Sequence, residues 1–139
     1  MGASHGHVSR VNHGRDDELV IGLPANPTAV RTARTVVEDA CRQWAVAPTP
    51  VEIVTLIVSE FATNVVRHVG GAFRLLVRHE RAVIRVEVED QLSCPPPRAL
   101  EPDVAAESGR GLLMVERLAH GWGCEPTPDG KRMWALVVA

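Results

Sequence analysis

Apolar positions recur every second residue in some parts of the chain and every third or fourth in others. After Val83, Ile or Val alternates with Arg or Glu from Ile84 to Glu89, which predicts a strand with one buried and one solvent-exposed face. A turn at 79–81 joins this strand to the preceding one as a hairpin, and Asp-Gly within 127–130 predicts a second hairpin turn. The strands expected from these patterns are 18–23, 73–78, 82–90, 122–126 and 132–138.

Helical spacing of apolar residues predicts two helices between the first and second strands. Asn26 is a helix-capping residue followed by Pro27, and an amphipathic segment begins there. Residues 48–50, Pro-Thr-Pro, separate it from a second helix at about 51–69. That second helix is apolar on most sides, so we expect it to be central, and Gly70 marks its end.

A long segment and a third helix follow the first hairpin. Residues 91–108 contain four prolines and predict a functional or mobile loop, and Gly109 opens a helix whose apolar face continues to Ala119. Residues 1–17 are rich in Gly, Ser, His and charge and predict a disordered tail, which leaves 18–139 as the folded domain. This order predicts an α+β fold: a two-layer sandwich with helices on one face of a mainly antiparallel sheet.

Composition excludes several classes of protein. With 139 residues, 45% of them hydrophobic, the chain is long and apolar enough for one packed domain. A net charge of −2 without a basic stripe argues against nucleic acid as a direct partner. Three distant cysteines favour neither a disulfide framework nor a zinc site. No apolar run approaches the roughly 20 residues of a membrane span, and no secretory signal is visible, so we expect a cytoplasmic protein.

Two polar residues interrupt the apolar second helix. Glu60 and Asn64 are four residues apart, which places them on one helical face. If both are buried, they need compensating partners, and a magnesium ion with a phosphate would supply them. Asn can offer its carbonyl oxygen to Mg²⁺, and Glu can orient or deprotonate a nucleophile. Taken alone, such a pair occurs by chance in many helices and is more often structural.

Two further features carry candidate chemistry. Asp90 ends a strand and begins the long loop, where its carboxylate can accept a hydrogen bond from an exocyclic amine such as that of adenine. It can equally bond its own turn. Gly109-Arg110-Gly111 stands at a helix start, where glycines allow close approach and free N–H groups attract phosphate. A single such motif is also found at ordinary helix entries.

Together and in this order, these features resemble the ATP-binding fold of gyrase B subunits, ninety-kilodalton heat-shock chaperones, sensor histidine kinases and mismatch-repair ATPases. Within that superfamily the chain is most similar to the small bacterial anti-sigma factor serine kinases. The resemblance covers about residues 19–138. The stretches that carry it are 23–25, 56–68, 86–90, 109–115, 122–123 and 130–135.

The resemblance implies a Bergerat-type ATP-binding fold with a mainly antiparallel mixed sheet, and it implies ATP and Mg²⁺ as cofactors. It assigns Glu60 as the base toward a partner's serine hydroxyl, Asn64 as the Mg²⁺ ligand and Asp90 as the adenine contact. The phosphate-binding turn would comprise Gly109, Arg110, Gly111 and Leu112. Arg67 and His68, one turn beyond Asn64, would line the pocket, although His68 can also interact with the helix dipole. The 91–108 loop would be the ATP lid.

The sequence departs from the family pattern at the adenine end. After Asp90 the superfamily usually has a D-x-G-x-G run, but here Gln91 to Cys94 contain no glycine and three prolines follow. On the final strand the family often has a Thr near the adenine, whereas here Gly130 is followed by Lys131 and Arg132. The phosphate end of the site therefore matches the family better than the adenine end.

The resemblance leaves three alternatives open. The first is an ATP-dependent serine/threonine kinase that phosphorylates an anti-anti-sigma factor, sequesters a sigma factor, or does both. The second is a catalytically degenerate module of the same fold that regulates transcription by docking. The third is a domain without a ligand, which would leave a buried Glu60–Asn64 pair unexplained. The family also implies a homodimer.

Overall fold

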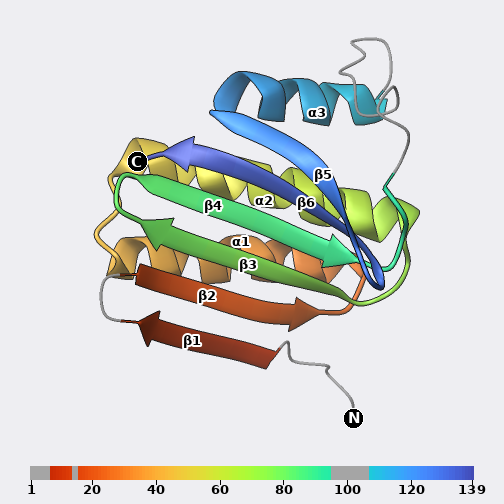
Figure 1. The fold of residues 1–139 in the computed structure, drawn as a ribbon, viewed down its shortest axis with the longest axis horizontal. Helices are drawn as coiled ribbons and strands as arrows, with labels where there is room; N and C mark the ends of the chain where they lie inside the picture. Colours follow the sequence, from red (N-terminus) through yellow and green to blue (C-terminus); the bar gives the residue numbers. More distant parts are fainter. Residues whose placement is uncertain (1–6, 14–15, 95–106) are drawn as a thin grey trace.

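A single six-stranded sheet carries three helices in the computed structural model, which describes residues 7–13, 16–94 and 107–139 (Figure 1). The strand order is β1-β2-β3-β4-β6-β5, and each of the five described pairings is antiparallel. The α+β prediction is confirmed, while the expected mixed sheet is antiparallel throughout its described strands. The elements are β1 His7–His13, β2 Asp16–Leu23, α1 Pro27–Gln43, α2 Pro48–His68, β3 Phe73–Glu80, β4 Val83–Asp90, α3 Glu107–Leu118, β5 Gly121–Thr127 and β6 Gly130–Val138.

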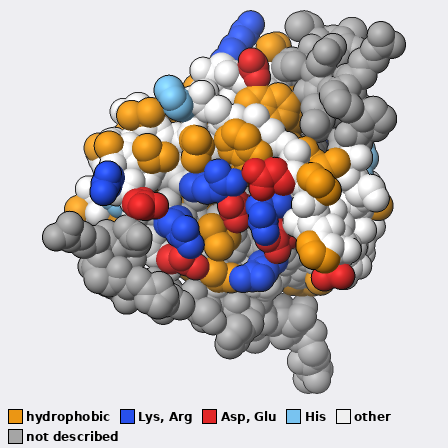
Figure 2. All heavy atoms as spheres, viewed as in Figure 1, with side chains coloured by type: hydrophobic (Ala, Val, Ile, Leu, Met, Phe, Trp, Pro, Cys, Tyr) orange, Lys and Arg blue, Asp and Glu red, His pale blue; other side chains and the backbone are white. Residues whose placement is uncertain are grey.

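The two faces of the sheet differ as the alternating pattern predicts. Along β4, Ile84, Val86 and Val88 are fully buried against the helices, while the residues between them remain partly accessible. The outer face bears paired charges: Arg85 Nε lies 2.6 Å from Glu87 Oε1, and the Arg85 guanidinium stacks over the Trp134 ring. Figure 2, in the orientation of Figure 1, shows basic and acidic side chains interleaved at the centre of this face. Such pairs satisfy one another in solvent and stabilise the fold only modestly.

Helix α2 is the centre of the helical layer. It packs against α1, α3, β4 and β6, and its Phe61 side chain is among the largest that are fully buried. By length and composition α2 could cross a membrane, so the expectation that no segment approaches that length is wrong. In the structure, however, the helix covers the sheet, and core helices of soluble proteins pass the same test.

The beginning of α1 and the end of α2 follow their sequence signals. The Asn26 side chain accepts a hydrogen bond of 2.9 Å from the Ala29 N–H, which confirms the predicted cap. After α2, Gly70 adopts φ 75°, a left-handed conformation that glycine adopts without strain, and its N–H reaches the Val65 carbonyl.

Several element boundaries differ from the sequence prediction, and three of the differences bear on the fold or the site. His7–His13, expected within a disordered tail, forms the edge strand β1 along β2, because backbone pairing requires no apolar periodicity. Pro48-Thr49-Pro50, expected as a separator, forms the first turn of α2, where a missing N–H costs nothing. Helix α3 begins at Glu107 rather than at Gly109, so two residues of the expected loop belong to it. Of the rest of the proposed lid, residues 91–94 are described directly after β4, whereas 95–106 lie outside the described residues.

Candidate functional site

Helix α2 presents Glu60 and Asn64 along one border of its buried stripe. The stripe consists of Val54, Ile57, Val58, Phe61, Ala62 and Val65. Glu60 and Asn64 are both half-buried, so the condition of full burial, under which they would need compensating partners, is not met. A half-buried carboxylate keeps water or a ligand as a partner, so burial alone no longer requires a cofactor here. The position is nevertheless suited to a reactive group, which must meet both the protein and a substrate.

Helix α3 brings Gly111 directly against Glu60. A Cβ atom added at position 111 would overlap the Glu60 carboxylate, with Oε2 the nearest atom. Only glycine therefore leaves the observed carboxylate position free. The structure thus joins two features that lie 51 residues apart in the chain: the candidate base and the glycine-containing turn. The contact brings α2 and α3 together at this point, while the roles assigned to the two residues stay predictions.

The variant Gly111→Ala tests this contact. Glycine to alanine inside a helix normally stabilises a protein by up to about 1 kcal/mol. Here we expect no gain, because the new methyl group displaces the Glu60 carboxylate. Thermal unfolding of Gly111→Ala and of Gly22→Ala, where an added Cβ meets nothing within 4 Å, measures the difference. A clear stabilisation of Gly111→Ala would contradict the close approach.

The other residues of the predicted phosphate-binding turn are placed unequally. Gly109 and Arg110 belong to the first turn of α3, where the structure describes the helical backbone but not the Arg110 side chain. Leu112 is only 8% exposed and belongs to the core, so its side chain serves packing, and as the sixth residue of α3 its N–H lies beyond the four free N–H groups at the start of the helix. Arg67 and His68 are exposed in the last turn of α2. Neither side chain is enclosed as a pocket wall would be.

Asp90 lies at the end of β4 on the inner face of the sheet and is the one charged residue buried in the described part of the chain. Its Oδ1 accepts a hydrogen bond of 2.9 Å from the Leu92 N–H, which is the local turn that the sequence left as an alternative. Its Oδ2 lies 2.5 Å from Nζ of Lys131, the residue directly opposite on β6. The predicted adenine acceptor is therefore engaged by a neighbouring strand.

The sequence interpretation singled out Lys131 as a departure from the family pattern but did not predict this ion pair. The signal was available: an Asp-Gly turn at 129–130 fixes the register of the last hairpin, and the cross-strand partner of Lys131 follows once β6 is paired with β4. The pairing of β6 with β4 depends on the tertiary fold, because α3 and β5 stand between the two strands in the sequence.

Two cysteines border the Asp90–Lys131 pair. Burial, together with a hydrogen bond that the Cys124 thiol donates to Cys94 and the nearby charges of Cys94 and Asp90, raises the pKa of the Cys124 thiol to about 12. Lys131 acts in the opposite direction on the same thiol. Cys124 is consequently a neutral thiol near pH 7 and a poor nucleophile. Cys124 thus adds a neutral thiol, and no activated nucleophile, beside the Asp90–Lys131 pair.

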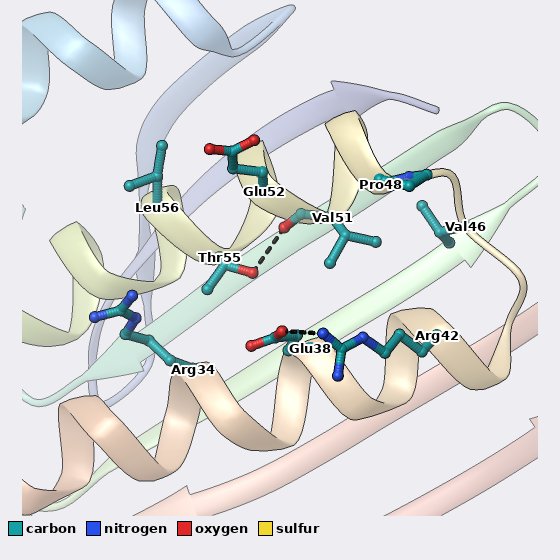
Figure 3. Close-up of a pocket in the computed structure, with 9 residues that line it drawn as sticks. All are labelled: Arg34, Glu38, Arg42, Val46, Pro48, Val51, Glu52, Thr55 and Leu56. Carbon is teal, nitrogen blue, oxygen red and sulfur yellow. Dashed lines mark hydrogen bonds and ion pairs between the residues drawn. The ribbon is translucent and has the colours of Figure 1, made fainter.

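The groove drawn in Figure 3 lies elsewhere. It has a volume of about 440 Å³ and runs between α1 and α2, with Arg34 and the Glu38–Arg42 ion pair on one side and Glu52 and Leu56 on the other. The described residues that line it include no member of the predicted site. Its charges of both signs and its single exposed leucine give it no distinct ligand chemistry.

The residues present fit the phosphate end of a nucleotide better than its base. Asn64, half-buried beside Glu60, could offer one oxygen to Mg²⁺. Among the described residues no cluster of three His, Cys, Asp or Glu side chains is placed to hold a metal, so phosphate oxygens and water would have to complete the coordination. At the base end, Asp90 could accept from an amine only in competition with Lys131.

Comparison with known proteins places these observations in a family. A family model described as a histidine kinase-like ATPase domain matches residues 23–135, which is most of the chain. A search of curated proteins finds no match.

Proposed function

Because this chain belongs to the family of histidine kinase-like ATPase domains, for which ATP is the implied ligand, we propose that it is an ATP-dependent protein serine/threonine kinase of the anti-sigma factor type. The observation that carries the proposal is the contact between Glu60 on α2 and Gly111 on α3. It places a candidate base beside the first turns of a helix, where backbone N–H groups attract phosphate.

In the proposed reaction each residue has one role. Glu60 accepts the proton of a serine or threonine hydroxyl on the partner. That oxygen then forms a bond to the γ-phosphorus of ATP while the bond from this phosphorus to the β,γ-bridging oxygen breaks. The first turns of α3, with Gly109, Arg110 and Gly111, hold the phosphates. Asn64 holds the Mg²⁺, which neutralises phosphate charge when bound.

The proposed partner is an anti-anti-sigma factor, whose phosphorylation blocks its binding, and the kinase freed of it sequesters a sigma factor. These partners, a homodimer and a cytoplasmic location rest on the resemblance of the motifs around Glu60, Asp90 and Gly111 to those of the anti-sigma kinases. The family match supports the domain type on which that proposal depends.

A labelling experiment tests the kinase proposal. The protein is incubated with Mg-ATP and the candidate antagonist encoded beside it, and the antagonist is then analysed by mass spectrometry for phosphoserine or phosphothreonine. We expect one modified hydroxyl that is absent when Mg-ATP is omitted. An unmodified antagonist, with nucleotide binding confirmed in the same preparation, would overturn the kinase proposal.

A second candidate function is a docking module that regulates transcription without phosphoryl transfer. The Asp90–Lys131 ion pair favours it, because the carboxylate expected to receive adenine is already engaged. Calorimetric titration with Mg-ATP separates the two candidates. Undetectable binding at millimolar nucleotide, together with retained binding of the protein partner, would support docking and exclude the kinase.

A further inference from the structure

The Asp90 carboxylate has protein donors on both of its oxygens. The Leu92 N–H donates to Oδ1 at 2.9 Å, and the Lys131 ammonium donates to Oδ2 at 2.5 Å. The Asp90 side chain is 1% exposed and the Lys131 side chain 12%, so water does not readily take the place of either one. In this environment an ammonium neutralises the carboxylate as well as hydrogen-bonding to it.

An adenine amine is a weaker partner for the same oxygen. It is a neutral donor, so exchanging Lys131 for adenine would leave a buried carboxylate without a compensating charge. We propose that Lys131 is an internal competitor for Asp90 and sets the adenine-nucleotide affinity of this chain. The proposal rests on the proposed nucleotide site and identifies the residue that tunes it.

The backbones of β4 and β6 are in close contact where Asp90 meets Lys131. A Cβ at Gly130 would overlap the Asp90 carbonyl oxygen and approach the Gln91 Cα within 2.7 Å, so the start of β6 is in tight contact with the end of β4. Asp90 and Lys131 are also directly opposite in the ladder. With the two strands in this contact, an amine can take the place of the Lys131 ammonium at Asp90 Oδ2 only when the Lys131 side chain moves.

Two substitutions at Lys131 test the proposal. Lys131→Met removes the ammonium at similar length, and Lys131→Thr introduces a short hydroxyl. Each variant is titrated calorimetrically, in Mg²⁺, with a non-hydrolysable ATP analogue and with the corresponding GTP analogue. We expect the ATP analogue to bind at least tenfold more tightly than it binds wild type.

The neighbouring variant Arg132→Gln is the matched control. Arg132 pairs with Glu89 on the outer face of the sheet, so the change removes a cation one residue away without touching Asp90. We expect its affinity to equal that of wild type. An equal gain in Arg132→Gln would overturn the proposal, because net charge and not competition for Asp90 would then set the affinity.

The double variant Asp90→Asn with Lys131→Met separates a change in nucleotide affinity from a loss of folding stability. It replaces the ion pair by neutral groups of similar size, so it restores any stability lost in Lys131→Met, measured by thermal unfolding. It must not show the affinity gain, since an amide is a poorer acceptor than a carboxylate. A gain as large as in Lys131→Met would show that Asp90 is not the adenine contact and would overturn the proposal.

The remaining outcomes separate this inference from the proposed function. If wild type and both Lys131 variants bind the ATP analogue equally well, the competition is refuted while the nucleotide site stands. If none of them binds at millimolar concentration, the nucleotide site itself fails. If wild type prefers the GTP analogue, Lys131 is a recognition group for a purine carbonyl rather than a competitor, and the inference is overturned.

Discussion

Replacing Asp90 by alanine is expected to lower the free energy of unfolding by about 3 kcal/mol. The change leaves the Lys131 ammonium, 12% exposed, without the carboxylate that neutralises it, and it also removes the acceptor of the Leu92 N–H. Removing one member of a buried ion pair costs more than the pair contributes, because the remaining charge is uncompensated. Urea denaturation followed by circular dichroism measures the loss.

Glu89→Ala is the matched control for this prediction. Glu89 precedes Asp90 on the same strand and also pairs with a basic residue of β6, since its Oε1 lies 2.6 Å from Arg132 Nη2. It faces outward, however, and its side chain is 30% exposed. Pairs at such sites contribute up to about 1 kcal/mol, so we expect a much smaller loss. Equal losses in the two variants would refute the special position of the Asp90–Lys131 pair.

Replacing Glu60 by glutamine is expected to lower the rate of phosphoryl transfer to the partner by at least about 100-fold. Glutamine keeps the shape of the side chain beside Gly111 but cannot accept the hydroxyl proton. The rate is measured under single-turnover conditions with saturating Mg-ATP. The affinity for a non-hydrolysable ATP analogue should change little, because the proposed phosphate and metal contacts come from α3 and Asn64.

Glu52→Gln provides the control on the same helix. Glu52 is exposed in the first turns of α2 and lines the groove of Figure 3, away from Glu60. The substitution removes an equal charge and should leave the rate unchanged. If Glu60→Gln transfers phosphate as fast as Glu52→Gln, Glu60 is not the base. A parallel loss of nucleotide affinity in Glu60→Gln would instead assign Glu60 to binding.

Most of the fold could be predicted from local patterns. Strict alternation in β4 encoded which residues face the helices, and Asn26 and Gly70 encoded the beginning of α1 and the end of α2. The errors arose where local signals are silent. Edge strand β1 forms through backbone hydrogen bonds to β2, and the pattern of its side chains does not predict this pairing. Helix α3 begins at Glu107, two residues before its first glycine, and the buried Leu112 and Val115 anchor it to the core further along.

The candidate site was predicted with less success, for a physical reason. Spacing places Glu60 and Asn64 on one face of a helix, but it does not say how deeply that face is buried, and the structure leaves both half-buried. Gly111 lies against Glu60, a contact between α2 and α3 that spacing along the chain does not specify. Leu112, expected at the ligand, belongs to the core, because a helix rising from the site must turn its apolar side toward α2.

The sequence by itself determined the elements, the faces of β4 and the identity of the residues available for chemistry, because these follow from periodicity and from side-chain type. Only the tertiary structure decided which of those residues meet. Asp90 and Lys131 are 41 residues apart and become partners because β6 pairs with β4 across an intervening helix and strand. Charges separated along a chain interact only after packing has removed water from between them, so the state of the adenine end is a property of the fold.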